Sequence, residues 1–277
     1  MKKDTAYLLT RKQNNQKITM LTCYDYPTAV LEDKAGIDII LVGDSVGTNI
    51  LGYESELEVT MDDIIHHLKA VRRGVSQAYL LADMPHASYE SPEQALSNAQ
   101  RLLSYGADGV KVEGVREDVV THLVENGVEV CGHIGLQPQT HQQKGFQGKS
   151  FAQAKELIEG ALTLEKAGIK LLLLELIPEE VGKLITEKVS VPTIGIGAGR
   201  FTDAQVLVVN DILGITPRKL KLAKKYQEYQ ELTSRVISQY KEDVEKKLFP
   251  AEENVRHMPE GELQQLIEWV EQSKDEV

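Results

Sequence analysis

Acidic residues recur at the ends of apolar, β-like runs in this 277-residue chain. Asp44 follows IDIILVG, Asp83 follows AYLLA, Glu113 ends GVKVE and Glu175 ends LLLLE. Carboxylate oxygens are the ligands that hard cations such as Mg²⁺ prefer. A carboxylate can also remove a proton next to a carbonyl group, while a cation stabilises the negative charge that develops. The pattern therefore predicts metal-assisted proton abstraction from a 2-oxo acid.

Further polar residues accompany these acids. Ser45 follows Asp44, Lys111 precedes Glu113 by two positions, and His133 lies in VCGHIG. Each has a structural alternative: an acid after a strand commonly caps a turn, Lys111 and Glu113 would form a weak rim ion pair, and a lone histidine is commonly a buried, hydrogen-bonded group. Caps do not require acids after four separate runs, and a carboxylate after four leucines must be paired, protonated or functional. The joint pattern favours an active site.

Eight short apolar runs alternate with amphipathic stretches. They are near-continuous in apolar character, which is typical of parallel strands covered on both faces. Eight such runs, each followed by an amphipathic stretch, predict a single (β/α)8 TIM barrel, with a doubly wound open sheet as the alternative. The carboxyl ends of barrel strands share one rim, so the acids would face a common cavity. The predicted strands are Ile18–Cys23, Ile37–Val42, Ala78–Ala82, Gly109–Val112, Val128–Gly132, Leu171–Leu174, Thr193–Ile196 and Val206–Val209.

Local signals place helices between these strands. Thr60 and Asp63 form a capping box, and Pro92 opens another helix after Ser91. We expect an N-terminal helix before the first strand. The charged stretch from 219 to 277 would supply the last barrel helix and a helical C-terminal tail. The prediction is one domain, residues 1–277, with a peripheral tail from about residue 255.

Composition excludes several classes of function. Lysine plus arginine is 31 and aspartate plus glutamate is 42, which gives a formal net charge of −11. This charge argues against nucleic acid or an anionic membrane as a partner, and no signal peptide or run of membrane-spanning length is evident. We expect a soluble, cytoplasmic protein. Cys23 and Cys131 lie in apolar runs and are expected to be buried hydrophobic residues.

Two other motifs have competing interpretations. His66 and His67 lie mid-helix beside two aspartates, but adjacent helical positions point about 100° apart, which favours a solvated face over a metal site. The glycine-rich GIGAG at 195–199 suits either a phosphate cradle or a tight barrel turn.

The chain resembles the ketopantoate hydroxymethyltransferase family of the phosphoenolpyruvate/pyruvate barrel superfamily. The matching stretches follow the family order over roughly residues 16–255 and include KITMLTCYDYPTA, ILVGDSVG, LGYESELEVT, ADMPHASY, GVKVEG, GHIGLQPQ, LLELIPEE and PTIGIGAG. The resemblance implies transfer of a hydroxymethyl group from 5,10-methylenetetrahydrofolate to 3-methyl-2-oxobutanoate. The product would be 2-dehydropantoate, for pantothenate synthesis.

The resemblance also implies roles for individual residues. Asp44 and Asp83 would bind one Mg²⁺ per subunit, and Glu113 would complete the metal site directly or through water. Glu175 would be the catalytic proton acceptor. Members of the family assemble as decamers of two pentameric rings, so a homodecamer is expected. The residues that would bind the oxo acid or line its pocket are Asp44, Ser45, Asp83, Lys111, Tyr24 and His133.

The chain departs from the family in several places, of which the loop 142–150 lies nearest the expected site, and two rival functions remain. Gln142–Ser150 reads QQKGFQGKS, shorter than the family's stretch at the barrel mouth, where folate or a lid would act. A related metal-dependent 2-oxo-acid lyase or aldolase would share the metal residues, whereas GHIGLQPQ and Tyr24 favour the transferase. A non-catalytic ring-forming barrel would have lost charged rim residues, and none is missing.

Overall fold

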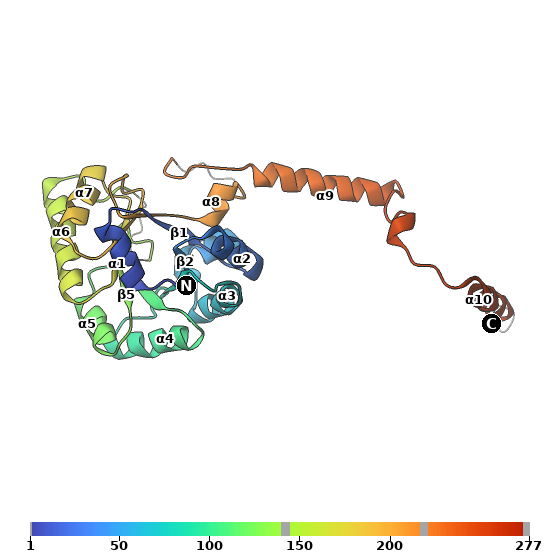
Figure 1. The fold of residues 1–277 in the computed structure, drawn as a ribbon, viewed down its shortest axis with the longest axis horizontal. Coiled ribbons are helices and arrows are strands. Elements are labelled where there is room, and N and C mark those ends of the chain that lie inside the picture. Colours follow the sequence, from blue (N-terminus) through green and yellow to red (C-terminus); the bar gives the residue numbers. More distant parts are fainter. Residues whose placement is uncertain (1, 140–144, 217–220, 274–277) are drawn as a thin grey trace. The chain divides into compact units, whose positions relative to one another are not determined.

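The computed structural model describes residues 2–139, 145–216 and 221–273. The chain forms two compact units, Met1–Gln227 and Glu228–Val277. In the described part of the first unit, eight parallel strands close into a barrel in chain order, with helices between them on the outside (Figure 1). The predicted (β/α)8 barrel is confirmed. The open doubly wound sheet is excluded because β1 pairs with β8.

The eight strands all overlap the predicted apolar runs. Seven strands include most of the predicted run. The eighth includes only half of it, because the strand lies two residues earlier in the sequence. The strands are β1 (Ile18–Thr22), β2 (Ile39–Val42), β3 (Tyr79–Asp83), β4 (Gly109–Glu113), β5 (Val130–Gly135), β6 (Leu171–Glu175), β7 (Thr193–Ile196) and β8 (Ala204–Leu207).

The last strand differs from the prediction for a physical reason. The sequence predicts it at Val206–Val209, but β8 covers Ala204–Leu207 and Val209 already begins the next helix. Gln205 is exposed on the outer face of this strand. A strand with an uncovered face does not read as a continuous apolar run, so its first half carries no such signal.

Three helix ends of the first unit lie where local signals predict. Thr60 caps α3, and the Asp63 carboxylate accepts a hydrogen bond from the Thr60 N–H at 2.9 Å. Ser91 caps α4, and Gly36 ends α2 with a left-handed φ of 85°. The helices are α1 (Thr5–Gln13), α2 (Tyr26–Ala35), α3 (Met61–Gly74), α4 (Pro92–Ser104), α5 (Glu117–Glu125), α6 (Phe151–Lys166), α7 (Glu179–Lys188) and α8 (Val209–Leu213), with short turns at Gly47–Leu51 and Glu56–Glu58.

Apolar side chains fill both sides of the barrel wall. Outward-facing Val42 and Leu172 pack in the layer beneath the helices, whereas inward-facing Leu81 and Leu173 belong to a separate cluster that fills the barrel. Cys23 and Cys131 are buried as predicted, one in each layer, and burial raises the pKa of both thiols. Each inward leucine lies two residues before an acid, so the polar strand ends rest on an apolar floor.

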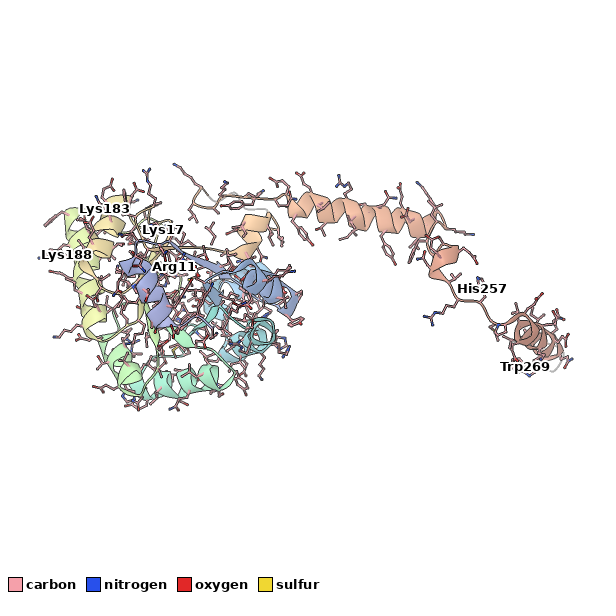
Figure 2. All side chains as sticks on the ribbon, in the orientation of Figure 1. Arg11, Lys17, Lys183, Lys188, His257 and Trp269 are labelled. Carbon is pink, nitrogen blue, oxygen red and sulfur yellow. The ribbon has the colours of Figure 1, made fainter. Side chains whose placement is uncertain are left out.

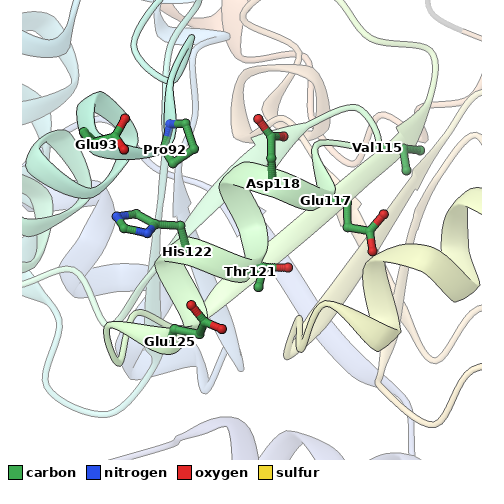
Figure 3. A pocket seen from close by; sticks show the side chains of 8 residues that line it. All are labelled: Pro92, Glu93, Val115, Glu117, Asp118, Thr121, His122 and Glu125. Atoms are coloured by element: carbon green, nitrogen blue, oxygen red, sulfur yellow. The ribbon is translucent and has the colours of Figure 1, made fainter.

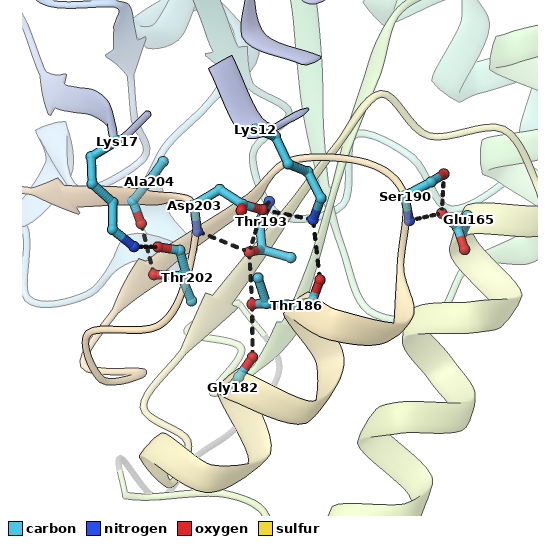
Figure 4. Close-up of polar contacts among 10 residues, drawn as sticks. All are labelled: Lys12, Lys17, Glu165, Gly182, Thr186, Ser190, Thr193, Thr202, Asp203 and Ala204. Carbon is cyan, nitrogen blue, oxygen red and sulfur yellow. Dashed lines mark hydrogen bonds and ion pairs between the residues drawn. The ribbon is translucent and has the colours of Figure 1, made fainter. Parts of the chain in front are cut away.

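The residues before β1 tie together the amino ends of several strands. Lys2 pairs with Asp108 at 2.5 Å, Lys3 with Asp38 at 2.8 Å and Lys12 with Asp203 at 2.8 Å, and each aspartate immediately precedes a strand. Asp203 also accepts hydrogen bonds from the Thr193 N–H and hydroxyl (Figure 4). The end of the barrel opposite the predicted active site is therefore closed by charge pairs and hydrogen bonds.

The second unit contains α9 (Tyr229–Glu245) and α10 (Glu260–Ser273), neither of which has a buried residue. The prediction that the stretch from 219 supplies the last barrel helix is wrong, because the helix that follows β8 is the five-residue α8. Periodicity identified helices here but carries no information on where they pack. Trp269 on α10 is 63% exposed (Figure 2). No described helix is both long enough and apolar enough to cross a bilayer.

A buried carboxylate joins α2 to the start of β3. Asp33 accepts hydrogen bonds from the backbone N–H groups of Ser76, Gln77 and Ala78 and from the Ser76 hydroxyl, at 2.7 to 3.0 Å. Burial acts to raise the pKa of Asp33, but these donors outweigh it and lower the pKa from 3.8 to about 2. Ionised Asp33 therefore stabilises the folded barrel.

Replacing this carboxylate gives a pH-dependent loss of stability. We expect Asp33→Asn to lower the free energy of unfolding by about 2 kcal/mol at pH 7, since the pKa is depressed by nearly two units. The wild-type advantage is full above the unfolded pKa of 3.8 and disappears as the pH falls through about 2. Urea denaturation at pH 7 and pH 3 measures it. Exposed Asp62→Asn is the control, and a gap that stays constant with pH contradicts the assignment.

Candidate active site

The strand register places the sequence-predicted residues side by side at the carboxyl ends of the strands. Asp83 on β3 is the register partner of Lys111 on β4, and Glu113 on β4 is the partner of His133 on β5. Gly135 on β5 is opposite Glu175 on β6. Because neighbouring parallel strands keep this register, residues that are far apart in the sequence lie next to each other at the carboxyl ends of the strands.

Lys111 and Asp83 form a buried ion pair. The Lys111 Nζ lies 2.8 Å from Asp83 Oδ2, and both side chains are at most 5% exposed. Burial raises the pKa of Asp83 to about 6, although Lys111 opposes the rise. For Lys111, burial acts against the charged form, but the facing carboxylates of Asp83 and Asp44 raise its pKa overall. The lysine is therefore held as an ammonium.

Asp44 and Ser45 follow β2 and join this pair to Tyr24. The Asp44 N–H donates to Asp83 Oδ2 at 2.9 Å, and burial raises the pKa of the Asp44 carboxyl. The Ser45 and Tyr24 hydroxyl oxygens are 2.8 Å apart.

The backbone carbonyl of Tyr24 contacts His67 Nδ1 at 2.6 Å, so this nitrogen carries the proton. The prediction of a solvated face is thus correct for exposed His66 and wrong for half-buried His67.

His133 lies between two carboxylates. Its Nδ1 is 3.3 Å from Glu113 Oε1 and its Nε2 is 3.3 Å from Glu175 Oε2. Burial opposes a charge on the ring, yet Glu113 and Glu175 raise the pKa of His133 to about 9. The contacts are at ion-pair distance without hydrogen-bond alignment. A protonated His133 balances both acids and keeps Glu175 near the strand ends.

A cavity of about 310 Å³ opens at these strand ends. Its lining combines polar residues, among them Asp44, Ser45 and Glu175, with apolar ones, among them Leu173, Ile196 and Val206. Leu176, which follows Glu175, has a left-handed φ of 46° and donates its N–H to the Ile196 carbonyl at 2.9 Å. Such a backbone costs on the order of 1 kcal/mol for a branched residue. The strain turns the chain at the cavity wall directly after Glu175.

The predicted metal residues leave unpaired oxygen atoms at this site. Asp83 Oδ1 and Glu113 Oε1 are buried without a hydrogen-bond partner. Among the described residues, no three His, Cys, Asp or Glu side chains are arranged to hold a metal ion on their own. Mg²⁺ usually keeps several ligands from water or substrate, so two or three carboxylates suffice for it. The donor set and the orphaned oxygens fit a hard cation that is completed by other ligands.

Two residues of this site are missing from the sequence prediction. Gln139 is 2% exposed and donates to Asp44 Oδ2 at 2.7 Å. Tyr89 is 7% exposed and donates its hydroxyl to Gln139 Oε1 at 2.5 Å. Both lie in motifs that carry the family resemblance, ADMPHASY and GHIGLQPQ. Uncharged residues in loops give no charge or periodicity signal, so only the motifs point to them.

Other predicted or hollow features lie apart from this chemistry. Gly199 has a φ of 81°, and a Cβ at Gly195 would lie 2.6 Å from the Thr202 hydroxyl oxygen, which supports a tight turn for GIGAG. In the loop 142–150, residues 142–144 lie outside the described part.

A groove of about 700 Å³ is lined by acids of α4 and α5 (Figure 3). It contains no predicted site residue, and its acids are exposed.

Replacing Lys111 should lower the stability of the protein, because a buried acid loses its counter-charge. We expect Lys111→Met to destabilise the protein by about 3 kcal/mol in the presence of a chelator, because Asp83 loses its counter-charge. Asp83→Asn in the same background should recover much of this loss. Thermal or urea unfolding of the three proteins measures the effect. Equal stability of Lys111→Met and wild type would show that the pair does not compensate buried charge.

Comparisons with known proteins identify the family of this chain. The family described as ketopantoate hydroxymethyltransferase matches residues 2–252. A 3-methyl-2-oxobutanoate hydroxymethyltransferase of Thermoanaerobacter sp. (strain X514) is 49% identical over 261 residues, covering 91% of this chain and 95% of that protein. One from Dehalococcoides mccartyi is 49% identical over 258 residues, 90% of this chain and 92% of that protein. A phosphonopyruvate hydrolase solved with oxalate and Mg²⁺ has the same fold, with a TM-score of 0.61 at 10% identity and 99% coverage of both chains. The chain belongs to the ketopantoate hydroxymethyltransferase family.

Proposed function

We propose that this protein transfers a hydroxymethyl group from 5,10-methylenetetrahydrofolate to 3-methyl-2-oxobutanoate and so forms 2-dehydropantoate for pantothenate synthesis. Relatives of this name at 49% identity over some nine-tenths of the chain support the proposal. The structural observation that carries it is the 310 Å³ cavity, whose lining brings Glu175 and Asp44 together with apolar residues. A carboxylate base, an apolar side for a branched alkyl group and an acid cluster for a cation belong to one reaction at this site.

We assign Asp44 and Asp83 as direct ligands of Mg²⁺, with Glu113 acting directly or through water. The buried oxygens without partners on Asp83 and Glu113 support this assignment. When bound, Mg²⁺ supplies positive charge that polarises the ketone of a 2-oxo acid. Lys111 neutralises one carboxylate of the group, so the cation would meet a site with fewer net negative charges.

The chain's own residues bind and orient the oxo acid. Lys111 and Ser45 provide a cation and a hydroxyl for its carboxylate, and the Tyr24 hydroxyl holds Ser45 from behind. Leu173, Ile196 and Val206 offer an apolar surface that matches an isopropyl group. A longer or charged side chain at C3 would bury a polar group or overfill the cavity.

Glu175 is the proposed base, and His133 positions it. The Glu175 carboxylate takes the proton from C3, and the electron pair of the broken C–H bond forms the new C–C bond to the one-carbon unit. Both bonds from that carbon to the folate nitrogens break, and water supplies the hydroxyl group. The two nitrogens take up the proton removed from C3 and the remaining proton of the water. The contact with His133 holds the carboxylate at the cavity wall.

We further propose that the protein works in the cytoplasm as a homo-oligomer, with the decamer as the expected form. Gln205 and Thr19 are exposed on the outer faces of the paired strands β8 and β1, where a barrel would ordinarily carry a helix. α9 presents exposed Val236, Ile237 and Tyr240. Contact with further copies of the chain would cover such surfaces. Light scattering of the purified protein gives the assembly mass.

The base assignment predicts a selective defect. Glu175→Gln should slow exchange of the C3 proton by about 10²- to 10⁴-fold, because the amide does not accept the proton, while metal and oxo-acid binding persist. Proton NMR in deuterated water measures the exchange, and calorimetry measures the binding. Glu180→Gln, an exposed site on the following helix, is the matched control. Exchange at the wild-type rate would remove Glu175 from the base role.

The two halves of the reaction can be separated in one tube. With 3-methyl-2-oxobutanoate and Mg²⁺ in deuterated water, we expect metal-dependent loss of the C3 proton signal. Addition of 5,10-methylenetetrahydrofolate should then give 2-dehydropantoate. Exchange without product would contradict the transferase proposal in favour of a related lyase. Absence of exchange would contradict the oxo-acid site itself.

A further inference from the structure

Gln139 contacts two of the three proposed metal carboxylates from opposite ends of one residue. Its side-chain Nε2 donates to Asp44 Oδ2 at 2.7 Å and to the Met84 carbonyl at 3.1 Å. Its backbone N–H donates to Glu113 Oε2 at 3.1 Å. Asp44, Met84 and Glu113 follow or end three neighbouring strands, so this single loop residue links β2, β3 and β4 at their carboxyl ends.

These hydrogen bonds divide the oxygens of the acid cluster. Asp44 Oδ2 and Glu113 Oε2 accept from Gln139, while Asp83 Oδ2 accepts from Lys111 and the Asp44 N–H. Asp83 Oδ1 and Glu113 Oε1 have no hydrogen-bond partner although they are buried. Each carboxylate thus accepts these hydrogen bonds through one oxygen. Of the other oxygens, Asp83 Oδ1 has no hydrogen-bond partner and Glu113 Oε1 has only the unaligned 3.3 Å contact with His133 Nδ1.

The Gln139 amide has one favourable direction, which its two acceptors set and the Tyr89 hydroxyl supports. Asp44 Oδ2 and the Met84 carbonyl are both acceptors, so they require the NH₂ end of the amide. The Tyr89 hydroxyl donates to Gln139 Oε1 at 2.5 Å at the other end. With the amide turned over, an oxygen would face a carboxylate and a carbonyl in a buried site, which is strongly unfavourable.

We propose that Gln139 is the positioning residue of the cation site and that Tyr89 acts through it by holding the amide oxygen in place. The proposal rests on the proposed function, because it takes Asp44 and Glu113 as residues of the metal site. Residues that orient metal ligands through hydrogen bonds typically change metal affinity by about 10- to 100-fold when they are replaced. Neither Gln139 nor Tyr89 touches the substrate in this role.

The test measures Mn²⁺ binding to the full chain by electron paramagnetic resonance, without substrate. Gln139→Met keeps the side-chain length and removes both side-chain donors, and it should raise the Mn²⁺ dissociation constant by about 10- to 100-fold. Tyr89→Phe retains the amide and should raise it by a smaller factor, about 3- to 10-fold. Gln100→Met, on an exposed position of α4, is the matched control and should bind as wild type does.

A double-mutant cycle separates positioning from general loss of structure. Because Tyr89 acts through the amide, Tyr89→Phe should have no further effect on Mn²⁺ binding in the Gln139→Met background. Additive effects would overturn the linkage. If Gln139→Met does not fold, as judged by circular dichroism, Tyr89→Phe alone decides, and unchanged Mn²⁺ affinity in that folded variant overturns the proposal.

The wild-type protein distinguishes this inference from the proposed function. Saturable Mn²⁺ binding that Asp83→Ala abolishes supports the metal site independently of Gln139. Wild-type binding together with unchanged binding in folded Gln139→Met rejects only the positioning role. If wild type itself has no saturable site, the metal assignment fails and the positioning role fails with it. A lower KM for the oxo acid in Gln139→Met than in wild type would also contradict the proposal.

Discussion

Burial of charge at the strand ends is the constraint on which the rest of this structure depends. Asp83, Asp44 and Glu113 lie within a barrel that is apolar beneath them, and water cannot solvate them there. Lys111 and His133 are the cations that compensate, and the parallel register brings each one beside an acid. The compensation is partial, because Asp83 Oδ1 has no hydrogen-bond partner and Glu113 Oε1 has only the unaligned contact with His133. The remaining negative charge suits the cation that we propose for the site.

Much of the barrel follows from the sequence because its strands are covered on both faces. A fully buried strand must be apolar throughout, so the runs IILV and LLLL predict β2 and β6. The apolar pattern does not predict the start of β8, because Gln205 faces outward there. It also does not apply to the helix α9. Helical periodicity records which residues share a face. The surface that covers that face can belong to a distant segment or to another chain.

The candidate site divides along a similar line. Acids and bases at strand ends, from Asp44 to Glu175, could be found from the sequence because charge after an apolar run is rare and the barrel topology brings strand ends together. Gln139 and Tyr89 could not, since both are uncharged and their importance comes from a hydrogen bond between loops fifty residues apart. The buried contact of His67 with the Tyr24 carbonyl was missed because it depends on the packing of α3.

Closure of the barrel joins the beginning of the chain to its far end. β1 pairs with β8, and Lys12 reaches Asp203 across 191 residues of sequence. During translation β1 emerges from the ribosome among the first elements, and one of its edges stays unpaired until almost the whole barrel has been synthesised. An open strand edge of this kind invites pairing with neighbouring chains. The nascent protein is therefore most exposed to misassembly just before the barrel is complete, and Lys12 is anchored only after Asp203 has been synthesised.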